Sequence, residues 1–342
     1  MPGPVFLRHD DGVVTFSPAD APTVRDPEPR LDTLVLEVVG GHLSWGLLSG
    51  QRTPAAVLHD PAAAQDWLWA VYGEPVAVAV ADGHVGEIPS APALPELADS
   101  ARRLGYALWA AHWWPASTID GIPVLDPRVL DQDLAHLSEA CEMIVDGADA
   151  LLAQNVSPVA VAQRDYALAA GPSTAAEPAG LILATGITGW DWRRCPPGIL
   201  DASESAVSWR LTRDSGVTTL GVAAVAAPRF DPGVPAHLWP RARVATTPTA
   251  TLDLTLHPDG DTWTGTAVTE AEDVAGVDIY VPGVGPSPVR NPTAADDPHG
   301  PAARRRIRDF ATNRLRAALH PPESGDAPLL AEIDAATTDQ EF

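Results

Sequence analysis

The densest group of chemically distinctive side chains is the segment GWDWRRCPPG, residues 189–198. Tryptophan and arginine are enriched at protein-binding hot spots, and Pro-Pro-Gly predicts a rigid loop. Two arginines beside a cysteine could also raise the thiolate fraction of Cys195. The segment therefore suggests a partner-binding loop, a catalytic thiol, or a structural loop whose tryptophans cover the edge of a sheet. The binding candidates are Trp190, Asp191, Trp192, Arg193 and Arg194.

A second group of aromatic side chains ends a helical pattern near residue 113. It contains Tyr106, Trp109, Trp113 and Trp114. Helical spacing places Tyr106, Trp109 and Trp113 along one stripe. Such a stripe can form the aromatic wall of a small-molecule pocket, and the same spacing is also typical of core packing.

Short signatures of common catalytic and cofactor sites are missing from the sequence. There is no GxSxG, HExxH, phosphate loop, GxGxxG or Cys-x-x-Cys. Two segments resemble metal ligands only superficially, His9-Asp10-Asp11 and the HPDGD run at 257–261. The first is a lone polar patch near the terminus, and the second is explained by turn formation. We therefore expect no metal and no cofactor.

An enzyme remains the main alternative to a binding protein. Its pocket would lie between two domains, and the loop 186–201 would serve as a lid. The candidate groups are Cys195, Asp191, Asp201 and a histidine such as His112. A nucleophilic cysteine needs a general base, and no histidine lies near Cys195 in the sequence.

The charge of the chain limits its partners. All 22 basic residues are arginine, against 45 carboxylates, and the formal net charge is -23. The absence of lysine excludes Schiff-base chemistry and a lysine general base. Two explanations of this absence stay open, which are codon usage in a GC-rich, actinobacterial genome and evasion of a lysine-directed modification. The negative charge disfavours nucleic acid and anionic membranes, and it favours a protein partner that presents basic surface.

The first half of the chain predicts hairpins and helices. Gly40-Gly41 between two apolar runs indicates a hairpin, and Asp60-Pro61 indicates a helix over 61–72. The run PVAVAVADGHVGEI, residues 75–88, predicts a second hairpin around an Asp-Gly turn.

Two longer helices are expected next. One runs over 95–113 and is apolar on two sides. The other starts at Asp126-Pro127 and continues over three heptads to about 152, with one apolar and one acidic face. A shorter helix is expected near 158–170.

The second half predicts strands and then a basic helix. About six alternating segments between 181 and 283 are typical of an antiparallel sandwich. Six arginines then fall within residues 304–316, on a helix whose apolar face includes Ile307 and Leu315. We expect this helix to pack on the protein's own acidic surface, such as the acidic face of the 127–152 helix.

These patterns together predict an α+β fold. N-terminal hairpins and packed helices are followed by an antiparallel β-sandwich-like domain and a C-terminal amphipathic helix. The expected parts are a Pro-rich segment (1–30), an α+β domain (31–170), the sandwich-like domain (171–283), a connector and basic helix (284–320), and a disordered acidic tail (321–342).

The function expected from these features is a non-enzymatic binding or assembly subunit of a bacterial protein complex. The start of the sequence has no secretory signal pattern, and two cysteines do not indicate a disulfide framework, so we expect a cytoplasmic protein. A third alternative is a scaffold that self-associates through the apolar seam of the 127–152 helix.

Overall fold

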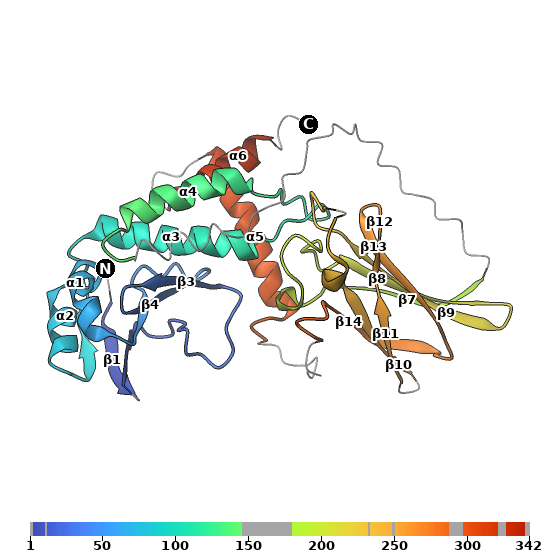
Figure 1. Cartoon of the computed structure of the whole chain (residues 1–342), viewed down its shortest axis with the longest axis horizontal. Helices are drawn as coiled ribbons and strands as arrows, with labels where there is room; N and C mark the ends of the chain where they lie inside the picture. Colours follow the sequence, from blue (N-terminus) through green and yellow to red (C-terminus); the bar gives the residue numbers. More distant parts are fainter. Residues whose placement is uncertain are drawn as a thin grey trace. The chain divides into compact units, whose positions relative to one another are not determined.

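The computed structural model of the chain describes residues 3–10, 12–145, 180–231, 233–247, 250–286, 297–320 and 326–338. They form an α+β fold with antiparallel sheets and a C-terminal helix, as the sequence predicts. The chain divides into two compact units (Figure 1). Unit 1 comprises residues 1–114, 125–157 and 302–342, and unit 2 comprises residues 115–124 and 158–301.

A six-stranded antiparallel sheet forms the base of unit 1, in the order β3-β4-β5-β2-β1-β6. The strands are β1 (Val5–Asp10), β2 (Val13–Ser17), β3 (Thr33–Val38), β4 (Gly41–Gly46), β5 (Ala55–Leu58) and β6 (Gly86–Ile88). Val38 pairs with Gly41, which confirms the hairpin at the Gly-Gly turn. Gly40 has a φ of +82°, and a side chain there would collide with the Asp60 carbonyl oxygen, so the turn requires glycine.

Strands β1 and β2 lie in the segment that we expected to be a Pro-rich surface stretch. Their side chains alternate between the core and the outside, and Val5, Leu7, Val14 and Phe16 are buried. Both strands are short, but they supply two of the six strands of the sheet. Strands β1 and β2 therefore contribute to the core of unit 1, whereas residues 18–30 contain no buried side chain.

Helices cover this sheet and build the rest of unit 1. They are α1 (Pro61–Tyr72), α2 (Glu74–Ala81), α3 (Pro95–Trp113), α4 (Pro127–Ala140), α5 (Pro301–Leu319) and α6 (Leu330–Thr338). The Asp60 side chain caps α1 by accepting from the N–H groups of Ala62 and Ala63, as predicted. Helix α3 has the predicted bounds and packs on β3 and α4 (Figure 1).

The hairpin predicted over residues 75–88 is wrong. Most of that run forms α2, and only Gly86–Ile88 forms a strand. Gly73 separates α2 from α1, and Pro75 occupies the first turn, where its missing N–H costs nothing. A short apolar run fits a buried helix as well as a strand, and here Val76, Ala77, Ala79 and Val80 are buried on the helix.

The acidic helix and the C-terminal tail are organised differently from our expectation. Helix α4 starts at Pro127 as predicted but ends at Ala140, and residues 146–179, which include the helix expected near 158–170, lie outside the described residues. The tail is not wholly disordered, because residues 330–338 form α6, which packs on α4. The Asp133 carboxylate on α4 accepts from the N–H groups of Leu330 and Ala331, both at 3.0 Å.

The basic helix α5 is a core element of unit 1. Its apolar face is buried as predicted, through Ile307, Ala311, Leu315 and Ala318. It contacts both α3 and α6: the Phe310 ring meets Tyr106 and Trp109 of α3, and Arg314 pairs with Glu332 of α6. Helix α6 packs on α4, and the docking of α5 on the acidic face of α4 stays a prediction.

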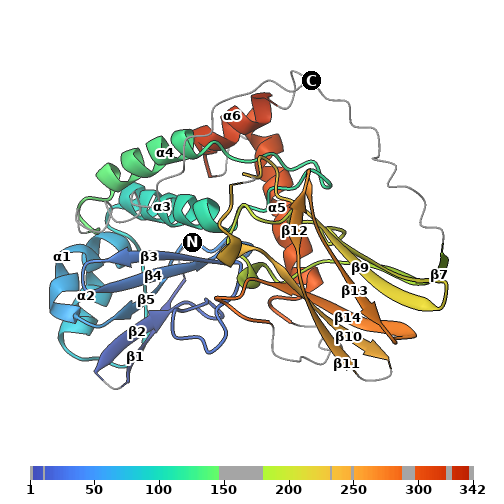
Figure 2. The same cartoon turned by 45° about the vertical axis from the view of Figure 1, so that its right-hand side comes forward.

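Unit 2 is built from two antiparallel sheets that lie face to face (Figure 2). The larger has the order β12-β13-β9-β8-β7 and the smaller β11-β10-β14. The strands are β7 (Leu181–Thr188), β8 (Val207–Asp214), β9 (Val217–Val225), β10 (Arg241–Thr247), β11 (Ala250–Thr255), β12 (His257–Asp259), β13 (Thr262–Thr269) and β14 (Asp273–Tyr280). Leu211, Leu220 and Val244 are fully buried between the sheets, which is the pattern that the alternating sequence predicts.

Among the helices that the structure describes, none combines the length and the hydropathy needed to cross a bilayer.

Candidate functional site

The Trp/Arg loop at 189–198 is folded onto unit 2. Trp190 and Trp192 are each only 6% exposed. The Trp190 indole N–H donates to the carbonyl of Asp201 at 2.7 Å, and Trp192 begins a short 3-10 helix, Trp192–Arg194. The structure thus buries the two aromatic side chains of the predicted binding loop.

The charges of this loop are paired within the loop itself. Asp191 accepts from Nε of Arg193 at 2.9 Å and from Nη2 at 2.7 Å, and Nε of Arg194 lies 3.6 Å from the same carboxylate. Burial alone would raise the pKa of Asp191, but the hydrogen bonds and charge of Arg193 outweigh burial and lower it. The loop therefore carries an internal ion-pair cluster.

The arginines do not activate Cys195, contrary to the mechanism considered from the sequence. Cys195 is 4% exposed, and burial, followed by the charges of Asp278 and Asp191, raises the pKa of its thiol. Cys141 is also free and buried, and burial raises its pKa to about 12. Both side chains are held as neutral thiols at physiological pH.

The other groups considered for catalysis, Asp201 and His112, make hydrogen bonds within the fold. Asp201 is fully buried and accepts from Ser117 Oγ at 2.7 Å, from Thr118 N at 2.7 Å and from Ser203 N at 2.8 Å. These bonds tie the segment 115–124 to the sandwich. His112 is exposed on α3, and its Nδ1 lies 3.1 Å from the carbonyl of Leu108. No cluster of three or more metal-ligating side chains occurs in the described part of the chain.

The predicted aromatic wall is partly assembled. The Tyr106 and Trp109 rings stack with centroids 5.9 Å apart, and Phe310 of α5 meets both edge-on. The Trp109 indole N–H donates to the carbonyl of Leu31 at 2.8 Å, which fixes this ring in the core. Trp113 and Trp114 are half-buried at the end of α3 and do not join this group of rings.

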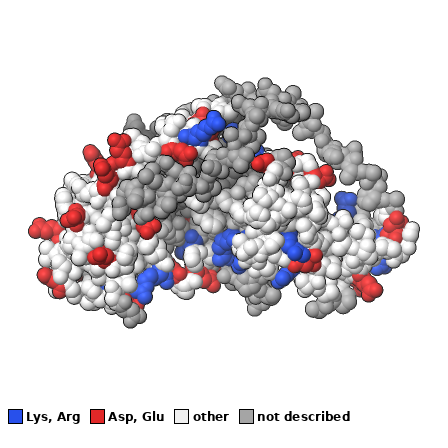
Figure 3. Space-filling model, in the orientation of Figure 1, with Lys and Arg blue, Asp and Glu red and all other residues white. Residues whose placement is uncertain are grey.

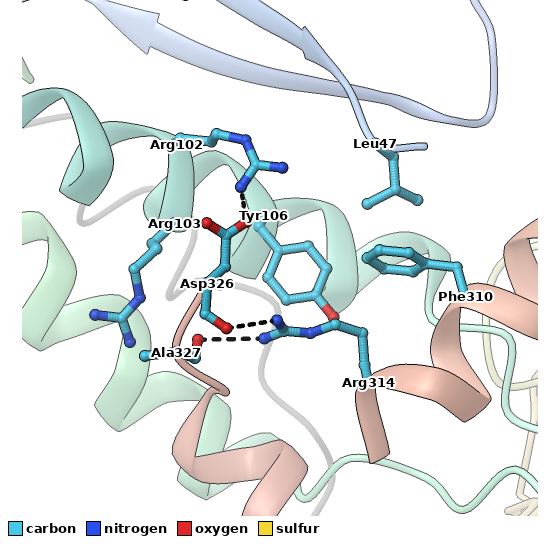
Figure 4. A pocket seen from close by; sticks show the side chains of 8 residues that line it. All are labelled: Leu47, Arg102, Arg103, Tyr106, Phe310, Arg314, Asp326 and Ala327. Atoms are coloured by element: carbon cyan, nitrogen blue, oxygen red, sulfur yellow. Dashed lines mark hydrogen bonds and ion pairs between the residues drawn. The ribbon is translucent and has the colours of Figure 1, made fainter. Parts of the chain in front are cut away.

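Tyr106 lines a small cavity of about 40 Å³ inside unit 1 (Figure 4). The walls come from α3, α5, the turn after β4 and the segment before α6. Besides Tyr106, the cavity is lined by three arginines, two large apolar side chains and two residues of the segment before α6. These residues are Arg102, Arg103, Arg314, Leu47, Phe310, Asp326 and Ala327.

Two of these arginines are held by carboxylates and carbonyl groups. Arg102 donates to the carbonyl of Gln51 at 3.0 Å and pairs with Asp326. Arg314 donates to the carbonyl groups of Asp326 and Ala327 at 2.9 and 3.2 Å (Figure 4). It also donates to the Glu332 carboxylate. Burial, together with the charges of Arg52 and Arg314, lowers the pKa of Arg102, which indicates crowding of positive charge.

Arg103 differs from its neighbours. Its side chain is half-buried. Its Nε is a fully buried donor without an acceptor. An unmet buried donor of this kind is costly.

The second notable surface is the free edge of the larger sheet in unit 2. Strand β7 is the end strand of that sheet among the described residues, and its sequence LILATGIT contains no charge and no proline. Leu181, Ile182 and Ile187 are 68%, 51% and 69% exposed. The visible surface of unit 2 also includes a broad area without charged side chains (Figure 3).

Two of these side chains belong to an aliphatic outer face. The register pairs Ile182 with Thr212 and Ile187 with Ser208, on the face of the sheet that turns away from the core. By the same register, Val217 and Val268 lie on this outer face, 50% and 72% exposed. The outer face therefore presents aliphatic groups from β7, β9 and β13.

Sequence reasoning found Tyr106 but missed the arginines around it. Arg102 and Arg103 precede Tyr106 by four and three residues, so they lie on the same side of the helix as its ring. That spacing was an available signal. Leu47, Arg314 and Asp326 carried no local signal, because only the tertiary fold brings them to α3.

Comparisons of the chain with protein-family models, with curated proteins and with solved structures found no match.

Proposed function

We propose that the protein is a non-enzymatic binding subunit of a cytoplasmic bacterial complex, and that unit 2 accepts a β-strand of a partner protein along β7. The observation that carries the proposal is the uncharged edge of this strand. Natural edge strands are usually protected by lysine, proline, bulges or a covering segment, because unpaired N–H and C=O groups recruit other strands. The irregularity between Ile182 and Ala184 leaves the stretch from Thr185 to Thr188 regularly paired with β8.

The exposed aliphatic groups support the same mode of recognition. In strand addition the backbone supplies affinity, and alternate side chains supply specificity. Ile182 and Ile187 would contact alternate side chains of the added strand on the outer face. Apolar groups at the edge of a sandwich are a liability in a monomer and are useful in a subunit of a complex.

The partner we propose is a different protein with basic surface around an extended apolar segment. A second copy of this chain would bring together two molecules with a formal charge of -23 each, which repel one another. A basic partner is attracted by the same field, and this attraction accelerates association.

The raised thiol pKa of Cys195 and the hydrogen-bonded role of Asp201 favour this binding role over the enzyme alternative built on these groups.

The test is affinity capture with three forms of the full chain, followed by hydrogen exchange on the purified complex. Ile187→Lys places a charge at the β7 edge, and Val217→Lys makes the same change on β9, which has a strand on each side. We expect wild type and Val217→Lys to recover the same partner and Ile187→Lys to lose it. In the complex, amides of β7 should gain protection.

Two results would contradict the proposal. One is recovery of the partner by Ile187→Lys, with protection that appears outside β7. The other is a dimeric mass of the isolated protein in light scattering that Ile187→Lys reduces to the monomer, because this would identify a second copy as the occupant of the edge.

A further inference from the structure

Strand β7 directs the N–H and C=O groups of alternate residues toward its free edge, and the hairpin between β8 and β9 determines which residues these are. Ser215 and Gly216 have φ angles of +49° and +85°, as in a type I′ turn, so the flanking residues Asp214 and Val217 form a hydrogen-bonded pair. Hydrogen-bonded and non-hydrogen-bonded pairs alternate along antiparallel strands. The β8–β9 register has no irregularity, so the even-numbered residues of β8 bond to β9 and the odd-numbered residues bond to β7.

The opposite end of β8 gives the same assignment, because the N–H of Val225 donates to the carbonyl of Ala206 at 2.8 Å. The register between β7 and β8 then bonds Gly186, and the residues two before and two after it, to β8. The N–H and C=O groups of Thr185 and Ile187 therefore point to the free edge. No hydrogen bond within the described part of the chain joins these groups to another strand.

These free groups match a three-residue segment that runs antiparallel to β7. Its first residue pairs with Ile187 and its third with Thr185, each through two N–H···O bonds, because opposite residues of antiparallel strands exchange both bonds. A parallel segment needs a longer run for the same bonds, and the irregularity between Ile182 and Ala184 interrupts the edge beyond Thr185. The geometry of the edge thus favours a short antiparallel occupant.

The two faces of the sheet determine which side chains this segment should carry. The first and third residues lie on the outer face beside Ile187 and Thr185, where an aliphatic pair and a pair of hydroxyl side chains are favourable. The middle residue lies on the inner side, beside Gly186. The Trp209 indole covers this glycine, because a Cβ on Gly186 would lie 2.5 Å from two ring carbons. The ring of Trp209 therefore extends toward the free edge and offers an aromatic contact to the middle residue.

We infer that the strand accepted at β7 carries an aliphatic, an aromatic and a hydroxyl side chain in consecutive positions, as in Val-Phe-Thr, and has basic residues on either side. The basic residues follow from the net charge of -23, since β7 itself carries no charge. This preference rests on the strand addition proposed for β7, and it adds the direction, the register and the sequence class of the partner segment.

Amide exchange in the free full chain, resolved by NMR, tests the register without a partner. The Gly186 amide should exchange slowly, and the Thr185 and Ile187 amides should exchange at least about tenfold faster, because only the first is hydrogen-bonded within the sheet. Exchange of Ile187 as slow as that of Gly186 would overturn the register, whether or not a partner binds along β7.

Four capped peptides test the sequence class by calorimetry. They are RRVFTRR, its reversal RRTFVRR, and RRVFTRR with an N-methyl group on either Phe or Thr. We expect RRVFTRR to bind with a dissociation constant on the order of 1 mM and the reversal about fivefold more weakly. Methylation of Thr should weaken binding at least about tenfold, because that N–H donates to the Thr185 carbonyl, and methylation of Phe should not, because its N–H points away from β7. Equal binding of both sequences, no binding of RRVFTRR at about 10 mM, or a loss on methylation of Phe in place of Thr would each overturn the preference.

Two variants test the aromatic contact. Trp209→Leu should bind RRVFTRR about fivefold more weakly than wild type and bind RRVATRR equally, since only the phenyl ring uses the indole. Trp239→Leu makes the same change beside His257 of β12, at the other edge of the sheet, and should bind like wild type. Equal effects of the two variants would refute the contact. Protection of β7 amides by the natural partner, with no preference among the peptides, would refute the sequence class and leave the proposed function standing, whereas no protection of β7 in that complex would refute both.

Discussion

Arg314 holds Glu332 through two parallel hydrogen bonds, from Nε to Oε1 at 2.8 Å and from Nη2 to Oε2 at 2.6 Å. The Glu332 side chain has no exposed surface. It also accepts from the Tyr106 hydroxyl and from the N–H of Leu329, both at 2.7 Å. One buried carboxylate therefore connects α3, α5 and α6.

Replacing this carboxylate should destabilise unit 1 strongly. Glu332→Gln leaves the Arg314 charge buried without its partner. The cost of removing this charge from water is then no longer offset by the Glu332 carboxylate. Breaking one side of a buried ion pair costs about 3–5 kcal/mol, so we expect a loss of that order in the free energy of unfolding. Urea unfolding followed by the fluorescence of the tryptophans measures it.

The matched control for this variant lies two residues away on the same helix. Asp334→Asn also removes one negative charge from α6, but Asp334 is exposed. It should change the free energy of unfolding by less than about 0.5 kcal/mol. A similar effect of both variants would mean that net charge, and not the connection of three helices, governs the stability of unit 1.

The buried Asp201 should have an equivalent role in unit 2. Asp201→Asn weakens the hydrogen bonds that hold Ser117 and Thr118 against the sandwich. We expect the free energy of unfolding of unit 2 to fall by about 2–4 kcal/mol, as for other buried hydrogen-bonded networks. Hydrogen exchange should show faster opening of residues 115–124, while Glu270→Gln, an exposed change in the same unit, should leave exchange unaltered.

Local signals in the sequence predicted elements whose ends are marked by side chains. Asp60 and Pro61 start α1, Asp126 and Pro127 start α4, and the alternating residues of unit 2 form strands. The hairpin predicted over residues 75–88 was wrong for a physical reason. The run that became α2 is short and apolar throughout, so its period does not distinguish a helix from a strand.

The candidate site was less predictable because tertiary contacts decide it. The loop at 189–198 has the composition of an interface, but Trp190 and Trp192 are buried. The tail looked too polar to fold, yet Glu332 is the most buried carboxylate of α6, and Asp133 of α4 satisfies two N–H groups at its start. Neither pairing leaves a signal within one window of the sequence.

The pH dependence of the Asp191 cluster has a defined direction. Arg193 lowers the pKa of Asp191 in the folded state below the ordinary value of 3.8. As the pH falls, the carboxylate of Asp191 is therefore protonated at a higher pH in the unfolded chain than in the folded protein. The ion pair stabilises the folded protein above about pH 4, and this stabilisation is lost as the pH falls below that value. Asp191→Asn should be less stable than wild type at pH 7, and the difference should shrink near pH 2.5. A difference that is constant over this range would contradict the ion pair.

The two cysteines should be almost inert in the folded protein. Burial raises the pKa of Cys141 from 9.0 to about 12, which lowers its thiolate fraction at pH 8 by about a thousandfold, since each pKa unit is a factor of ten. Burial also raises the pKa of Cys195.

The variants Cys195→Ser and Cys141→Ser each keep one cysteine, so each reports on the thiol that remains. We expect iodoacetamide to modify both variants slowly in buffer and rapidly in 8 M urea. Fast modification of Cys195 in the folded Cys141→Ser variant at pH 7 would show an activated thiolate and would favour the enzyme alternative. Slow modification of both variants, with full reactivity after unfolding, would exclude Cys195 as a nucleophile and leave the binding role of unit 2 as the function to be tested.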